Sequence, residues 1–94
     1  MGSRRGKTMN RLYTIIVGSH VVRGLISPGE LPDLKTDFIR MASQYGAIVD
    51  FSINRLRARK EGLELIFILG GYHCSMPGLT ASDSLSREMK ELFT

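Results

Sequence analysis

The sequence predicts an α+β domain of two layers, in which a small mixed or antiparallel sheet of three to four strands is covered on one face by two helices. Three observations lead to this prediction. Stretches rich in β-branched residues are interspersed with two stretches of helical period. The chain has 94 residues, which is the size of a single domain. The order β, β, α, β, β, α buries its apolar side chains most simply with both helices on one side of one sheet.

The charge distribution separates a basic N-terminal segment from a nearly neutral body. Residues 1–23 carry five basic groups and no acid, whereas residues 24–94 carry eight basic and nine acidic groups, which gives the net charge of +4. We expect residues 1–10 to form a flexible basic tail, either a remnant of cloning or a segment ahead of an alternative start at Met9. Residues 11–94 then form the single α+β domain.

The first two strands are predicted on either side of a short glycine turn. Residues 12–18 are rich in β-branched and aromatic residues, as a buried strand is. The dipeptide Gly18-Ser19 is typical of a two-residue hairpin turn, so residues 20–26 are predicted to form a short second strand that is interrupted by Gly24. The competing interpretation of residues 20–26 is an apolar loop.

The first helix is predicted to begin near Asp33. Residues 27–30 have the form of a capping box and predict one turn, but Pro32 is expected to block a regular helix there. Asp33 can then serve as the N-cap, and Gly46 can end the helix in a left-handed conformation. The apolar stripe between them consists of Leu34, Phe38, Met41, Ala42 and Tyr45.

An antiparallel hairpin is predicted after this helix. From residue 47 the period is two, and Val49, Phe51 and Ile53 share one face. Past Asn54 the apolar side chains change face, which indicates a bulge or the edge of the sheet near residues 54–55. Residues 60–62 are predicted to turn, and residues 63–69 to form the returning strand.

A loop and a closing helix complete the predicted fold. Residues 70–78 are punctuated by glycine and proline, which predicts a loop. Thr80, with Asp83 three residues later, then provides a helix N-cap. The apolar positions of this amphipathic helix are Leu85, Met89, Leu92 and Phe93.

This arrangement leaves an apolar sheet face uncovered. If the helices cover the face of Val49 and Phe51, the opposite face carries isoleucines, and contiguous exposed apolar surface usually marks a contact surface. We therefore expect a regulatory protein partner or a second copy to dock there, unless residues 19–32 fold over the patch or the strands share this face differently. The predicted contacts are Ile16, Ile66 and Ile68 as desolvated anchors and Arg55, Arg57 and Arg59 as a charged rim.

The sequence offers few groups for catalysis or metal binding. The chain has His20, His73 and a single cysteine, Cys74, which are too few to build a metal site or an oriented nucleophile. The glycines after residue 69 match no phosphate-binding pattern. We therefore expect no catalytic residue, no cofactor and no metal, and we predict that the protein is not an enzyme.

No segment predicts a membrane span or an export signal. The apolar stretches are shorter than the roughly 18 to 20 residues that cross a bilayer. The basic start of the chain is not followed by the apolar region of a signal peptide. We expect a cytoplasmic protein that does not bind membranes.

Nucleic-acid binding is the alternative function. The basic residues of the N-terminal arm, together with Arg55, Arg57 and Arg59, could contact phosphates. These three arginines are called the arginine stripe. Glu61 and Glu64 partly cancel its charge, and no aromatic residue is interleaved with the arginines for base stacking. A steep loss of affinity with salt would distinguish this function.

The element order resembles that of the DinI-like damage-response proteins. The resemblance is carried by residues 12–18, the helix that ends Ala42-Ser-Gln-Tyr-Gly46, the hairpin of residues 48–53 and 65–69, and the closing helix. Small prophage antirepressors are similar in scale. The resemblance implies a phage or bacterial inhibitor or antirepressor that binds and occludes a regulatory protein.

The chain departs from the DinI-like pattern in two places. Its closing helix has balanced charge, whereas that of the DinI family is strongly acidic, and residues 20–26 have no counterpart there. These departures argue against an activity directed at RecA, and no residue roles are transferred from the family.

Overall fold

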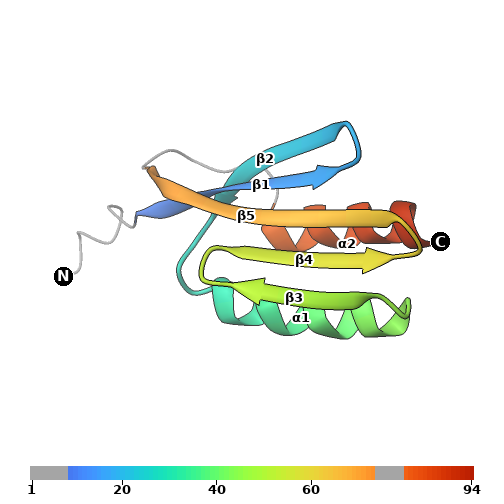
Figure 1. The fold of residues 1–94 in the computed structure, drawn as a ribbon. Coiled ribbons are helices and arrows are strands. Elements are labelled where there is room, and N and C mark those ends of the chain that lie inside the picture. The colour runs from blue at the N-terminus through green and yellow to red at the C-terminus, as the bar shows by residue number, and fades with distance from the viewer. Residues whose placement is uncertain (1–8, 74–79) are drawn as a thin grey trace.

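The computed structural model describes residues 9–73 and 80–94, which form an antiparallel sheet with two helices packed behind it (Figure 1). The elements are β1 (Asn10–Val17), β2 (His20–Ile26), α1 (Leu31–Gln44), β3 (Ile48–Ser52), β4 (Arg55–Lys60), β5 (Leu63–His73) and α2 (Ala81–Phe93). The strand order is β2-β1-β5-β4-β3, and all neighbours are antiparallel. The α+β class and the two helices on one face are confirmed.

The predicted tail, except for its last two residues, and Cys74 lie outside the described residues.

The sheet has five strands rather than the predicted three or four because the chain reverses at Ile53-Asn54. Ser52 pairs directly with Arg55, so Ile53 and Asn54 between them form a complete two-residue hairpin turn. Of the two predicted alternatives near residues 54–55, a bulge or the edge of the sheet, the bulge is therefore wrong. A two-residue turn moves the apolar side chains from odd to even positions just as a one-residue bulge does. Neither turn residue is a glycine or has a positive φ, so the usual sequence signal of a hairpin is missing.

The other two hairpin turns use residues with a positive φ. Gly18 has φ 61° and joins β1 to β2, which confirms the predicted turn and the strand at residues 20–26. Glu61 and Gly62 have φ 50° and 85°. Positive φ at both central residues is the pattern of a type I′ turn, which matches the right-handed twist of the strands that it joins.

Strand β5 continues four residues past its predicted end at residue 69. The extra residues pair with the start of β1, so the Gly70-Gly71 segment that predicted a loop is part of the sheet. The guanidinium of Arg11 holds this segment. Its Nε and Nη2 atoms donate to the carbonyl of Gly70 at 3.0 and 2.9 Å, and its Cζ atom lies 5.2 Å from the ring centre of Tyr72.

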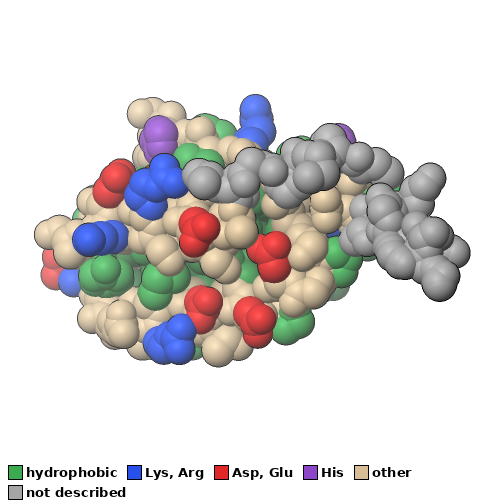
Figure 2. Space-filling view, turned by 180° about the vertical axis from the view of Figure 1, so that it is seen from behind, with side chains coloured by type: hydrophobic (Ala, Val, Ile, Leu, Met, Phe, Trp, Pro, Cys, Tyr) green, Lys and Arg blue, Asp and Glu red, His purple; other side chains and the backbone are tan. Residues whose placement is uncertain are grey.

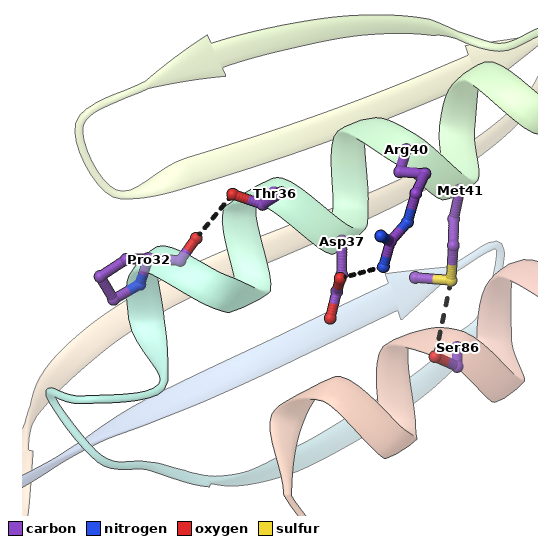
Figure 3. Close-up of polar contacts among 6 residues, drawn as sticks. All are labelled: Pro32, Thr36, Asp37, Arg40, Met41 and Ser86. Carbon is purple, nitrogen blue, oxygen red and sulfur yellow. Dashed lines mark hydrogen bonds and ion pairs between the residues drawn. The ribbon is translucent and has the colours of Figure 1, made fainter.

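Helix α1 begins two residues before the prediction. Glu30 is the N-cap, and Pro32 lies in the first turn, where a backbone N–H has no partner within the helix. The assignment of Asp33 as N-cap is therefore wrong. The carbonyl of Pro32 still accepts a hydrogen bond from Thr36 Oγ1 at 3.1 Å (Figure 3).

The end of α1 matches the prediction. Gly46 has φ 73°, and its N–H donates to the carbonyl of Ser43 at 3.1 Å. The N–H of Ala47 donates to the carbonyl of Ala42 at 2.9 Å. These two bonds form a Schellman motif, which satisfies carbonyls that the helix leaves without partners.

Helix α2 begins as predicted and packs beside α1. Thr80 Oγ1 accepts a hydrogen bond from the N–H of Asp83 at 3.2 Å. Ser86 Oγ lies 3.5 Å from the sulfur of Met41 across the helix pair (Figure 3). The stacked rings of Tyr45 and Phe93 make a second contact between the ends of the two helices.

Tyr13 links the sheet to the helix layer. Its ring stacks on Phe67 with 5.6 Å between the centroids, and its hydroxyl lies 3.1 Å from Ser84 Oγ in the buried core. The ring lies over Gly24 of the neighbouring strand, where an added Cβ would be 2.5 Å from the tyrosine oxygen. Gly24 is therefore the residue that lets the ring lie flat between β2 and α2.

We predict that Gly24→Ala destabilises the protein by about 1 to 3 kcal/mol, because the new methyl group overlaps the Tyr13 ring. The measurement is the free energy of unfolding in urea. Gly71→Ala is the matched control in β5, since a Cβ there meets no atom within 4 Å. Equal stability of the two variants would contradict this role of Gly24.

Candidate functional site

One face of the sheet, here called the open face, lies opposite both helices (Figure 1). Strand β1 shows the division: Tyr13 and Ile15 point to the helices and are 1% and 0% exposed. Thr14 and Ile16 alternate with them, so they point to the open face. The strand is thus apolar on both sides, and the helices cover one of them.

The central row of the open face crosses all five strands. Strand pairing aligns Ile16 with a β2 residue on one side and with Ile66 on the other, and the row then continues into β4 and β3. The apolar members lie on β2, β1 and β5, and the charged members lie on β4 and β3. In strand order the row is Val21, Ile16, Ile66, Arg57 and Asp50.

A second row lies one pleat away on the same face. It contains one apolar side chain at its centre, flanked by polar and cationic groups. In strand order the row is Arg23, Thr14, Ile68, Arg55 and Ser52. We call the apolar residues of the two rows, Ile16, Val21, Ile66 and Ile68, the open-face patch.

All six residues predicted as partner contacts lie on the open face. The three isoleucines are partly buried by their neighbours within the sheet. Residues 19–32, the predicted alternative cover, do not fold over them: residues 20–26 extend the sheet as strand β2, and the segment then runs into α1 on the opposite face (Figure 1). The predicted residues are Ile16, Ile66, Ile68, Arg55, Arg57 and Arg59.

The arginines of the open face differ in their partners. Arg57 forms an ion pair with Glu64, and Arg59 Nη2 lies 2.8 Å from Asp50 Oδ2. The side chains of Arg55 and of its counterpart on β2, Arg23, form no ion pair or hydrogen bond with another described residue. Their backbones are three strands apart, or roughly 14 Å.

Charge is distributed unequally between the two layers. Among the described residues, the open face carries four arginines and two carboxylates, whereas the two helices carry four basic and five acidic residues. Figure 2 shows the helix side, where Asp and Glu side chains are interspersed with Lys and Arg. The open face is therefore the more positive side of the described protein.

Sequence reasoning missed Val21 and Arg23. Val21 is 47% exposed beside Ile16, and Arg23 is exposed beside Thr14. The face on which they lie depends on the register of β2, which a two-residue turn at Gly18-Ser19 fixes. The Gly18-Ser19 turn carries the signal, because a two-residue turn pairs Val17 with His20 and so places Val21 opposite Ile16.

A hollow of about 270 Å³ lies at the end of the open-face patch, beside the turns that follow β1 and β4. A larger and more open hollow of about 500 Å³ lies around the second of these turns. The residues of the larger hollow include the two cations Arg59 and Lys60 and the two carboxylates Glu61 and Glu64. Its opposite charges are balanced and select no anionic or cationic ligand.

The two histidines lie at opposite ends of β1. His20 pairs with Val17, and its Nε2 lies 3.5 Å from an oxygen of Glu88. His73 pairs with Asn10 at the other end of the strand. One site cannot contain both histidines, and the described residues hold no cluster of three or more metal-binding side chains.

Neither helix in the described part of the chain has the length and apolarity needed to cross a bilayer.

Comparisons with known proteins gave no relative for this chain: no family model, curated protein or solved structure matched it. The resemblance to DinI-like proteins thus stays a prediction.

We predict that two adjacent isoleucines differ sharply in their effect on stability. Ile15→Ala should lower the free energy of unfolding by about 2 to 4 kcal/mol, because Ile15 is fully buried against the helices. Ile16→Ala should cost less than about 1.5 kcal/mol, because its side chain lies on the open face. Urea unfolding of both variants tests this, and equal losses would show that the open face is itself a core.

Proposed function

We propose that this protein is a non-enzymatic binding module, and that its open face docks onto a protein surface with an apolar centre and acidic groups around it. The observation that carries the proposal is the position of the open-face patch. It lies opposite both helices and is flanked by two arginines, Arg23 and Arg55, whose side chains form no ion pair or hydrogen bond with another described residue.

The open-face patch would supply the binding energy. Ile16, Val21, Ile66 and Ile68 adjoin one another on three neighbouring strands, so a partner can remove all four from water at once. Apolar side chains that are desolvated at the centre of an interface contribute most to affinity, whereas polar residues at the rim contribute less.

The arginines would select the partner. Arg57 and Arg59 are already neutralised by carboxylates, so the uncompensated charge of the open face lies at Arg23 and Arg55. Charges at the rim of an interface speed association with oppositely charged surfaces and disfavour like-charged ones. The partner is therefore expected to carry carboxylates spaced to reach both arginines.

Occlusion of the partner is the mode of action that fits a small single domain with one such face. We propose that the protein acts in the cytoplasm as a phage or bacterial inhibitor or antirepressor, which covers the functional surface of a regulatory protein in a one-to-one complex. This role needs no catalytic group.

Nucleic-acid binding has less support. Two of the three arginines in the stripe are paired with carboxylates, which reduces the charge available to phosphates. The basic arm on which this alternative also depends lies outside the described residues.

The test compares capture by the full chain with capture by two open-face variants, in host lysate with and without nuclease. Arg55→Glu should weaken capture of the partner about tenfold, through loss of an attractive charge and addition of a repulsive one. Ile66→Thr should weaken it as well, while keeping a β-branched side chain in the strand. The matched controls are Lys35→Glu on α1 and Ile53→Thr in the β3–β4 turn, where Ile53 is 88% exposed.

Three results would contradict the proposal. One is capture that the open-face variants leave unchanged. Another is capture that the control variants reduce equally. The third is loss of the captured material on nuclease treatment, together with a steep dependence of binding on salt, which would instead support the nucleic-acid function.

A further inference from the structure

Strand β3 forms an exposed apolar edge of the sheet. Ile48 and Phe51 on this strand are 64% and 54% exposed. Edge strands are usually protected from pairing by lysine, proline or a bulge. Strand β3 contains neither residue and pairs with β4 without a register shift. Its one charged residue, Asp50, is already bound to Arg59.

The hydrogen bonding of β4 shows which backbone groups of β3 face outward. Successive residues of an antiparallel strand turn their N–H and C=O groups to opposite sides. The carbonyl of Asn54 accepts from Leu69 of β5 at 2.8 Å, so the next residue, Arg55, faces β3. Its partner there is Ser52, whose backbone groups therefore face inward.

Alternation along β3 then assigns its remaining residues. Asp50 and Ile48 face β4 as Ser52 does, so Val49 and Phe51 turn their N–H and C=O groups to the free edge. The side chains of Val49 and Phe51 lie on the helix face, since they pair with the buried residues of β4. The free edge thus offers two donors and two acceptors beside apolar side chains.

We propose that β3 pairs with β3 of a second copy of this chain, antiparallel, with Asp50 at the two-fold axis. In this register Val49 lies opposite Phe51 of the second copy, and the two strands exchange four backbone hydrogen bonds. Apolar side chains meet on the helix face. On the open face the two Asp50 carboxylates meet, each neutralised by its own Arg59, so the charges of this group sum to zero.

Helix α1 adds apolar surface beside the same edge. Met41 points towards α2, because its sulfur contacts Ser86. Ile39 precedes it by two residues, or about 200° around the helix, so it points away from α2 and to the side of the free edge. Ile39 is 43% exposed. A second copy paired at β3 would bring the two Ile39 side chains towards each other below the joined sheet.

This dimer is independent of the proposed function, because it uses the edge of the sheet and leaves the open face free. It would join two five-stranded sheets into one of ten strands, with the open faces of both copies on the same side. Loss of the dimer and loss of partner binding can therefore be measured separately.

Position-specific crosslinking tests the register. With Cys74→Ser to remove the native thiol, Asp50→Cys should form a disulfide between copies under mild oxidation, because the two Cα atoms at the axis lie about 4.5 Å apart. The product would have twice the chain mass of 10.5 kDa. Ser52→Cys is the control on the same face, where the two copies lie about 14 Å apart along the strands and should not crosslink. No crosslink at position 50, or equal crosslinking at both positions, would overturn the proposal.

Light scattering and hydrogen exchange on the unmodified chain provide the second test. The chain should have twice its monomer mass, Phe51→Lys should be monomeric, and Ile53→Lys, which lies in the turn, should remain a dimer. The amides of Val49 and Phe51 should exchange slowly in the dimer and rapidly in Phe51→Lys. A monomeric wild-type chain, or a dimer in which these two amides exchange rapidly, would overturn the proposal.

Discussion

Burial on one side of the sheet is the constraint on which this protein depends. Strands β1 and β5 lie at the centre of the sheet and carry apolar side chains on both faces. The two helices fill one face, where Tyr13 stacks on Phe67 and bonds to Ser84 across the layer. The chain folds because that face becomes a close-packed core, and the remaining apolar side chains stay on the open face as a consequence of the same alternation.

Much of this arrangement follows from the sequence, because it depends on periodicity. Both helices, the cap at Thr80 and the glycine at position 46 follow from residue spacing alone. The fifth strand is not set in this way. The apolar side chains change parity at Asn54, and a bulge and a two-residue turn produce the same change. Without a glycine in the Ile53-Asn54 turn, local sequence cannot distinguish the two, and pairing with β5 decides between them.

The fifth strand changes the surroundings of Arg55, Arg57 and Arg59. In a single bulged strand the three arginines would lie at the edge of the sheet, with no further strand beside them. In the five-stranded sheet they lie on β4, between Glu64 of β5 and Asp50 of β3, and two of the three are neutralised. Which arginines of the open face are neutralised and which are not therefore depends on the pairing of the strands. The same pairing brings Arg23, from a distant part of the sequence, into the row of Arg55.

Accessibility of the isoleucine methyl groups in the full chain tests the central claim most directly. A soluble paramagnetic agent broadens the NMR signals of methyl groups that solvent reaches. The account predicts clear broadening for Ile16, Ile66 and Ile68, and little for Ile15, which is 0% exposed in the core. Protection of the first three equal to that of Ile15, in the chain without a partner, would show that the open face is already covered and would contradict the account.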